Sequence, residues 1–216
     1  MSDPLLIVDN PAQYVRRLTL NRPEKRNALS NALRGEIFRE LEAADTDAEV
    51  RVVIIRGAGT CFSAGYDLSS EARSLPPPFA TATGPGHWAR HVVEGAFRIW
   101  DLAKPVIAQV HGWCLAGGSE LATSCDLVYV AEDAQIGYPP VRSMSPPDNQ
   151  FHPWLCGMRP AMEIMGLRAA IRAGTEIQAL ALSTATSKDA FAQFRDSVTK
   201  ALDARDTDFA DYRRKP

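Results

Sequence analysis

One passage of the sequence, residues 112–126, constrains the fold more than any other. It consists of Gly-Trp-Cys-Leu-Ala-Gly-Gly-Ser-Glu-Leu-Ala-Thr-Ser-Cys-Asp and follows a continuous apolar run, 105–110, that predicts a buried strand. Two adjacent glycines, Gly117 and Gly118, then lead into residues that tolerate a helix. The passage therefore predicts a strand, a tight turn and a helix in direct succession.

The start of this predicted helix carries groups that suit a developing negative charge. Gly117 and Gly118 let the backbone approach a ligand closely, and the first amides of a helix have no partner within it. Those amides and the positive end of the helix dipole favour an oxygen that is gaining negative charge. Glu120 follows Gly117 by about one turn, so its carboxylate can lie near the same pocket. This arrangement fits proton transfer next to a carbonyl, and a packing turn with a solvated Glu120 is the alternative.

Composition limits the class of protein to which the chain can belong. The 216 residues are 45% hydrophobic and 23% charged with a formal net charge of -2, which is typical of a globular protein with one core. The charge is balanced without a basic stripe, and no apolar run approaches the roughly 18 residues of a membrane span. We therefore expect neither a nucleic-acid nor a membrane partner. The short acidic N-terminus and the scattered cysteines lead us to expect a cytoplasmic protein.

Histidines and cysteines do not form a metal-binding pattern in the sequence. The four cysteines show no Cys-x-x-Cys spacing, and the four histidines are not clustered with them. His87 and His91 are four residues apart and could form a metal pair, but no further ligands are evident. We expect core or surface histidines and no metal site.

Hydrophobic periodicity predicts further elements on both sides of the central passage. Ser30 is a suitable cap for a helix whose apolar positions, Leu33, Ile37 and Leu41, recur every four residues. The predicted strands are an opening hairpin of 5–8 and 15–20 and single strands at 52–55, 127–131 and 134–138. A loop is predicted at 75–86. Further helices are predicted over 88–102, over 151–165 with an interruption near 157–160, and in the C-terminal part over 166–182 and 188–204.

A second glycine-rich passage, residues 56–68, follows the predicted strand at 52–55. Here too the backbone can approach a ligand, and the amide after Gly65 belongs to Tyr66. Two such passages could supply two hydrogen-bond donors to one oxygen.

Four blocks, in this order, resemble the enoyl-CoA hydratase/isomerase family, whose members are also called crotonases. The blocks are Asn21-Arg22-Pro23-Glu24-Lys25-Arg26-Asn27-Ala28-Leu29, Phe62-Ser63-Ala64-Gly65-Tyr66-Asp67-Leu68, residues 112–126, and Ile136-Gly137-Tyr138-Pro139. The resemblance implies an α/β crotonase fold, which is a spiral of β-β-α units over 1–165, and a helical C-terminal region, 166–216. It also implies assembly into a homotrimer or a dimer of trimers.

The resemblance also implies an enzyme that acts on an acyl-CoA thioester, with coenzyme A as part of the substrate and no other cofactor. The amides of Tyr66 and Gly117 would form the oxyanion hole for an enolate, and Glu120 matches the first of two catalytic glutamates of the hydratases. The residues implied in coenzyme A binding are Ala64, Asp67 and Leu68 along its arm and Lys25 or Arg26 at its phosphates, for which a solvated turn is the alternative.

One departure from the family pattern concerns the chemistry. The second glutamate of the hydratases is replaced by Pro140, which has no titratable group. Asp148, and with weaker support Tyr138 or His152, could substitute for it. One carboxylate suffices to move a proton between two carbons, so the departure favours isomerisation over hydration.

Two alternatives to an isomerase or hydratase stay open at this point. An acyl-CoA binding paralogue without turnover would keep the oxyanion amides and lack a complete acid and base set, although it would not need Glu120. A nucleophilic hydrolase using Ser119 or Ser63 has less support, because no histidine is evidently placed beside either serine.

A second departure lies at Met165 and Gly166, where family members have an additional helical stretch. Either the chain has lost this stretch, or residues are missing from the sequence between these two positions, and we expect the second. Their Cα atoms should then lie farther apart than the roughly 3.8 Å of a peptide-bonded pair.

Overall fold

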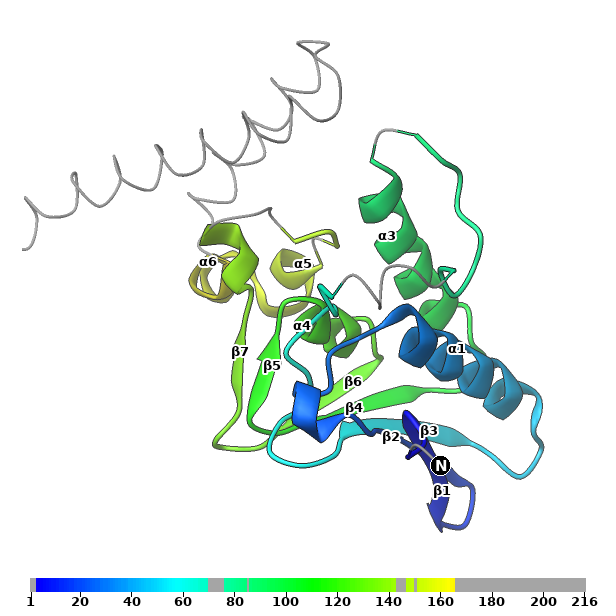
Figure 1. Ribbon diagram of the computed structural model, residues 1–216. Helices are drawn as coiled ribbons and strands as arrows, with labels where there is room; N and C mark the ends of the chain where they lie inside the picture. The colour runs from blue at the N-terminus through cyan, green and yellow to red at the C-terminus, as the bar shows by residue number, and fades with distance from the viewer. Residues whose placement is uncertain (1–2, 70–75, 85, 143–146, 150, 166–216) are drawn as a thin grey trace, which may run out of the picture. The chain divides into compact units, whose positions relative to one another are not determined.

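The computed structural model describes residues 3–69, 76–84, 86–142, 147–149 and 151–165 (Figure 1). They belong to two compact units. The first comprises the residues up to 137 together with 148–155, and the second comprises 138–147 and the residues from 156 onward. Within the described ranges no helix is long and apolar enough to cross a membrane.

A five-stranded sheet forms the base of the first unit (Figure 1). Its first two strands are an antiparallel hairpin, and the others run parallel to their neighbours. The hairpin and the further strands predicted from the sequence are confirmed, with boundaries that differ by at most four residues. The order across the sheet is β1 (Leu6–Ala12), β2 (Val15–Leu20), β3 (Val52–Gly57), β4 (Val106–Val110) and β6 (Leu127–Val130).

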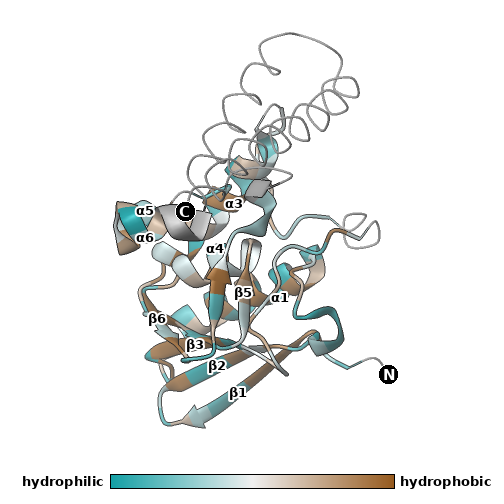
Figure 2. Cartoon of the chain, turned by 90° about the vertical axis from the view of Figure 1, so that its left-hand side faces the viewer, coloured by the Kyte–Doolittle hydropathy of each residue, from teal (hydrophilic) through white to brown (hydrophobic). Residues whose placement is uncertain are grey.

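Helix α1 (Asn31–Thr46) forms as the sequence predicts. The Ser30 hydroxyl accepts a hydrogen bond of 3.2 Å from the amide of Leu33, which satisfies one of the free amides of the first turn. Leu33, Ile37 and Leu41 recur on one face and are buried. Helix α3 (His87–Trp100) occupies the second predicted helical segment, and both helices lie on the same side of the sheet (Figures 1 and 2).

The chain after β4 differs from the direct strand, turn and helix that the sequence predicts. A short strand, β5 (Trp113–Leu115), lies between β4 and helix α4 (Gly117–Thr123). It pairs in parallel with β7 (Gln135–Gly137). A strand of three residues is too short to show the alternation of apolar and polar residues by which a strand is recognised in a sequence. Its conformation depends instead on its pairing with β7. The order of two strands and then a helix, β1-β2-α1 and β4-β5-α4, gives the predicted β-β-α units.

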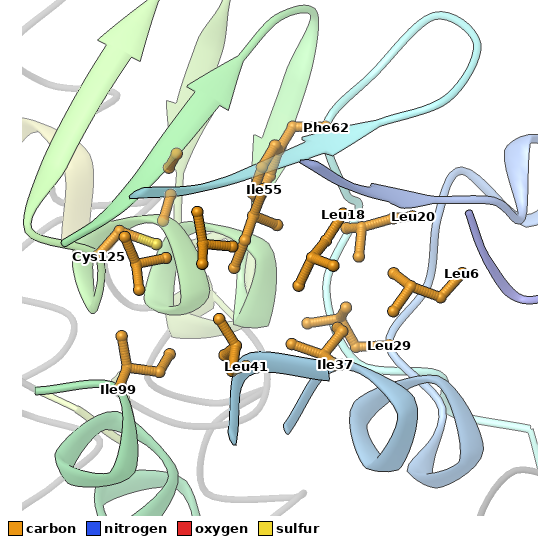
Figure 3. Close-up of a cluster of buried hydrophobic side chains, with 14 of the residues drawn as sticks. Leu6, Leu18, Leu20, Leu29, Ile37, Leu41, Ile55, Phe62, Ile99 and Cys125 are labelled. Atoms are coloured by element: carbon orange, nitrogen blue, oxygen red, sulfur yellow. The ribbon is translucent and has the colours of Figure 1, made fainter. Parts of the chain in front are cut away.

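The hydrophobic core lies between the sheet and the helices on this side. Leu18, Leu20 and Ile55 of the strands pack with Ile37 and Leu41 of α1 (Figure 3). Along the strands, hydrophobic residues are interspersed with hydrophilic ones, as Figure 2 shows. Because α1 packs on this core, its buried face is fixed relative to the carboxyl ends of the parallel strands, where the glycine-rich passages begin.

The remaining described elements are short. Gly157, with a φ of 84°, separates the last two helices, which confirms the predicted interruption. The predicted helices over 166–182 and 188–204 lie outside the described residues, as does Gly166, so the expected break after Met165 stays a prediction. The short elements are the 3₁₀ turns η1 (Pro23–Lys25) and η2 (Pro139–Arg142) and the helices α5 (His152–Cys156) and α6 (Met158–Met165).

Candidate active site

The two glycine-rich passages meet in the first unit. The amide of Ser63 donates to the carbonyl of Trp113 over 3.0 Å, and the amide of Leu115 donates to the carbonyl of Ser63 over 2.9 Å. This pairing brings Gly65 against the start of α4. A Cβ atom built on Gly65 would lie 2.8 Å from the Cβ of Ala116 and 3.2 Å from the amide nitrogen of Gly117. Only a glycine at position 65 permits this approach, which makes the amides of Tyr66 and Gly117 close neighbours.

The backbone at Ala116 turns sharply to start α4. Ala116 has a φ of 49° and a ψ of -124°, a conformation that is strained for a residue with a Cβ atom. Its amide is held by the carbonyl of Gly137 at 2.9 Å, and its carbonyl begins the helix by accepting from Glu120. Among the residues that the structure describes, the amides of Tyr66 and Gly117 donate to no backbone or side-chain acceptor. The geometry therefore leaves two adjacent donors available to one oxygen atom.

The Tyr66 side chain covers Gly117. A Cβ atom on Gly117 would lie 2.5 to 2.8 Å from three atoms of the Tyr66 ring, so position 117 accepts only glycine while the ring is in place. Burial raises the pKa of the Tyr66 hydroxyl well above its usual range, and the negative charge of Glu120 raises it further. The phenol is therefore neutral at neutral pH, and the Tyr66 ring forms one wall of the site.

Ser63 and Asn27 hold the first passage in shape. The Ser63 hydroxyl donates to the carbonyl of Asn27 over 2.8 Å and accepts from the amide of Gly65 over 3.2 Å. The Asn27 amide group donates 2.9 Å hydrogen bonds to the carbonyls of Ala58 and Cys61. Both side chains are fully buried, so these bonds fix the loop firmly.

The hydroxyl groups of Ser63 and Ser119 are engaged with the backbone. Ser119 donates to the carbonyl of Ala116 over 2.8 Å, as Ser63 does to that of Asn27. Neither hydroxyl is paired with a base, which a nucleophilic serine requires. The geometry gives both serines a positioning role and does not favour the hydrolase alternative.

Glu120 is the buried carboxylate of the site, with 1% of the residue exposed. Its Oε1 accepts hydrogen bonds from the amides of Asp148 at 2.7 Å and Asn149 at 3.3 Å. Its Oε2 is buried and has no hydrogen-bond partner within the described residues. Oε2 is therefore held in position by the rest of the carboxylate and is available for proton transfer.

The environment raises the pKa of Glu120 to about 7. Burial is the main cause, because it penalises the charged form, and the charge of Asp148 adds to it. The hydrogen bonds from the amides of Asn149 and Asp148 oppose the shift, as does the nearby Tyr66 phenol, although the phenol forms no hydrogen bond of normal geometry with Oε2. A carboxyl group with a pKa near neutrality can both accept and return a proton.

Asp148 lies beside Glu120 as a second carboxylate. Its backbone amide binds Glu120, and its Oδ2 accepts a 2.8 Å hydrogen bond from the indole nitrogen of Trp88. Burial raises the pKa of Asp148, while the Trp88 bond lowers it. Asp148, which is one of the substitutes considered for the missing glutamate, is hydrogen-bonded to Glu120 through its backbone amide. Tyr138 and Pro140 belong to the second unit.

A pocket enclosing about 420 Å³, part of it open to solvent, connects these groups. Apolar side chains form most of its wall, as is usual for small-molecule sites. Among its described lining residues, Glu120 and Arg34 carry charge. The lining residues all belong to the first unit and are Leu29, Arg34, Ile37, Phe38, Tyr66, Val92, Gly95, Ala96, Ile99, Gly117, Glu120, Leu121, Ser124 and Asn149.

The residues implied in coenzyme A binding lie around the first glycine-rich passage. The amide of Ala64 donates to the carbonyl of Arg26 over 2.9 Å, so the two segments run side by side. The side chains of Lys25 and Arg26 are exposed, and Leu68 is 61% exposed. Asp67 forms an ion pair with Arg22 at 2.8 Å. The structure thus gathers all five residues near Gly65, with two exposed cationic side chains.

Three residues near the site are absent from the sequence-based prediction. Arg34 could have been found, because it lies three residues before Ile37 and seven before Leu41, on the face of α1 expected to be apolar. Trp88 lies in the predicted helix over 88–102, and its indole nitrogen donates a hydrogen bond to Asp148. Asn149 follows Asp148 in an irregular loop, and no local pattern marks it.

His87 and His91 do not lead to a metal centre. In the described part of the chain, no group of three or more suitable side chains is placed to hold a metal ion. The ring of His91 is buried against Phe79, with 4.2 Å between centroids, and its Nδ1 lies 2.7 Å from the Thr81 hydroxyl. Burial lowers the pKa of His91 to about 4, which keeps it neutral.

Comparison with known proteins identifies relatives of this chain. A family model described as enoyl-CoA hydratase/isomerase matches residues 11–178. The chain is 42% identical over 129 residues to 2,3-dehydroadipyl-CoA hydratase of Escherichia coli (strain K12), and 37% identical over 134 residues to mitochondrial Delta(3,5)-Delta(2,4)-dienoyl-CoA isomerase of Homo sapiens. Each alignment covers 60% of this chain, and 48% and 41% of the two relatives, so the chain spans less than half the length of either.

Solved structures show the same relationship in three dimensions. An enoyl-CoA hydratase/isomerase from Xanthobacter autotrophicus Py2 is 31% identical with a TM-score of 0.65, covering 96% of this chain and 82% of that one. An enoyl-CoA hydratase from Bacillus anthracis is 30% identical with a TM-score of 0.64, covering 76% and 62%. The crotonase fold expected from the four sequence blocks is confirmed. With the family model matching most of its length, the chain belongs to the enoyl-CoA hydratase/isomerase, or crotonase, family.

Proposed function

We propose that this chain is an acyl-CoA enzyme that moves a carbon–carbon double bond through an enolate intermediate. The observation that carries this proposal is the Glu120 carboxylate, buried with Oε1 fixed by two amides and Oε2 free. It lines the same pocket as Gly117 and Tyr66, whose amides are available to an oxyanion. The amides would bind the thioester oxygen as it becomes negatively charged, and each such donor is worth about 3 kcal/mol in the transition state.

Glu120 would carry the proton in both halves of the reaction. With a 3-enoyl thioester, Oε2 removes a proton from C2, and the electron pair moves into a dienolate whose oxygen the two amides hold. The same carboxyl group then returns the proton to C4, so that the double bond lies between C2 and C3. No atom is gained or lost. Because the pKa of Glu120 is about 7, both forms of the carboxyl group are populated near neutral pH.

Hydration is a second candidate, which the position of Asp148 favours. Addition of water across a double bond needs a group to activate the water and a group to supply a proton. Asp148 lies beside Glu120, so two carboxyl groups are present despite Pro140. Within the described structure, Oδ2 of Asp148 already accepts a hydrogen bond from Trp88, whereas Oε2 of Glu120 accepts none. Asp148 is therefore less available than Glu120 to activate a water molecule. Isomerisation is therefore the first proposal.

Coenzyme A would lie along the first glycine-rich passage as part of the substrate, with no separate cofactor. The backbone of Ala64, Asp67 and Leu68 would line its arm, and the exposed cations Lys25 and Arg26 would meet its phosphates. The Arg22 ion pair supports this assignment because it fixes Asp67.

We further propose that the protein is a homotrimer or a dimer of trimers in the cytoplasm. All four residues of β6, which are Leu127, Val128, Tyr129 and Val130, are apolar and exposed at the edge of the sheet, a surface that favours a partner. None of the four cysteines, all within the described ranges, is in a disulfide, which supports a reducing compartment.

Absorbance of the conjugated enoyl thioester tests the reaction. The full chain is given a short 3-enoyl-CoA and, separately, the 2-enoyl isomer. Gain of absorbance from the 3-enoyl ester, lowered about 100-fold or more by Glu120→Gln, is the expected result. Loss of absorbance from the 2-enoyl ester alone would replace isomerisation by hydration. Silence with both esters, with acyl-CoA binding retained, would establish a binding protein. Glu94→Gln, on the exposed face of α3, is the matched control.

A further inference from the structure

The proposed function gives no role to Arg34, the other charged residue of the pocket. Arg34 lies on the buried face of α1, and only 6% of the residue is exposed. Arginine stays charged in proteins even where burial opposes it. A cation in a mostly apolar pocket costs free energy unless a partner compensates for it. Burial opposes the charged form of Arg34 more strongly than the charge of Glu120 favours it, so Glu120 compensates for the buried charge only in part.

The contacts of Arg34 leave most of its hydrogen-bonding capacity unused. Its Cζ lies 5.4 Å from the ring centroid of Tyr66 and 5.6 Å from that of Trp88, so two aromatic rings orient the guanidinium. One terminal nitrogen donates a long bond of 3.4 Å to Oδ1 of Asn31. Across the described ranges Arg34 forms no ion pair. A guanidinium has five N–H donors, so several remain for a ligand.

The position of Arg34 indicates where a ligand anion would lie. The Tyr66 ring lies against the Gly117 position, and the guanidinium of Arg34 lies within cation–π distance of the same ring. An anion on Arg34 would thus be a few carbons from the thioester carbonyl held by Gly117. The phosphates of coenzyme A extend away from that carbonyl in the direction opposite to the acyl chain. The acyl chain is therefore the part of the substrate that can reach Arg34.

We propose that Arg34 binds a carboxylate at the far end of a short acyl chain, so that the enzyme prefers ω-carboxyacyl-CoA thioesters. The inference rests on the proposed function, because it assumes that the pocket holds an acyl-CoA. A carboxylate matches the guanidinium in shape and can accept two parallel hydrogen bonds from it. It also neutralises Arg34, which is the cation among the described lining residues, without contacting Glu120, which carries the same charge as the ligand.

Binding of two unreactive esters tests this inference. Adipyl-CoA carries the terminal carboxylate, and hexanoyl-CoA has the same chain length without it. Calorimetric titration of the full chain should show at least about 10-fold tighter binding of adipyl-CoA. Arg34→Met should bring the ratio of the two affinities close to one, and Arg34→Lys should restore part of it. Arg39→Met, on the same helix with a side chain that is 67% exposed, should leave the ratio unchanged.

Turnover adds a second readout. In kcat/KM, the unchanged protein should prefer the CoA monothioester of hexenedioic acid to hexenoyl-CoA, and Arg34→Met should remove the preference mainly through KM. Equal binding of both esters, or a parallel loss for both in Arg34→Met, would overturn the role of Arg34 and leave the proposed function intact. Failure of the unchanged protein to bind either ester would overturn both. Thermal unfolding of each variant confirms that it is folded.

Discussion

Replacing Glu120 with glutamine should change how stability depends on pH. The pKa of Glu120 in the folded protein is about 7, against 4.5 for an exposed glutamate. Between these values the folded protein holds a proton that the unfolded chain releases, so the stability of the folded state falls as the pH rises. The loss begins near the lower value and is complete above the higher one. Glutamine carries no charge and is free of this dependence.

The magnitude follows from the shift in pKa. Each unit of pKa corresponds to about 1.4 kcal/mol, so ionised Glu120 costs about 3 kcal/mol of folding free energy at alkaline pH. The stability of Glu120→Gln minus that of the unchanged protein should therefore increase by about 3 kcal/mol between roughly pH 5 and pH 8. The glutamine oxygen can still accept from the amide of Asp148. The amide nitrogen of the glutamine changes the free energy of unfolding by an amount that does not depend on pH. The informative quantity is therefore the slope of the stability difference against pH.

Urea unfolding at a series of pH values measures this slope. Glu94→Gln, at an exposed position of α3, is the control, and its difference from the unchanged protein should stay constant over the same range. A stability difference for Glu120→Gln that does not depend on pH would refute the reasoning. It would mean that water reaches Oε2 and that the carboxylate is not desolvated in solution.

Two further substitutions address the surroundings of Glu120. Asp148→Asn removes a charge that raises the pKa of Glu120 and keeps an acceptor for Trp88, so the acid limb of the pH–activity profile should move to lower pH. An unchanged acid limb would mean that the charge of Asp148 does not influence the pKa of Glu120. Gly117→Ala places a Cβ atom 2.5 Å from the Tyr66 ring and should lower kcat about 100-fold through loss of oxyanion geometry. Its control, Gly35→Ala in α1, meets nothing closer than 4.0 Å and should raise stability by about 0.5 to 1 kcal/mol with kcat unchanged; equal kinetics for the two variants would contradict the assignment of Gly117.

The sequence by itself determined the local elements and the chemistry at their ends. Ser30 and the spacing of Leu33, Ile37 and Leu41 are sufficient to predict α1, because capping and periodicity act within a few residues. The glycines and Glu120 likewise form a recognisable pattern, because close backbone approach demands glycine wherever it occurs. The fold and family followed from these local signals, whereas the roles of the individual site residues stay predictions.

Only the tertiary structure decided which distant residues share the site. Pairing of Ser63 with β5 brings together passages about fifty residues apart in the chain, and this pairing depends on hydrogen bonds that leave no local pattern. The same holds for Asp148, whose amide reaches Glu120 from an irregular loop. Arg34 interrupts the apolar face of α1, but its neighbours cannot be read from the sequence. Packing of α1 on the core places Arg34 near Tyr66. Burial, which arises only in the folded chain, turns an ordinary glutamate into a group that titrates near neutral pH.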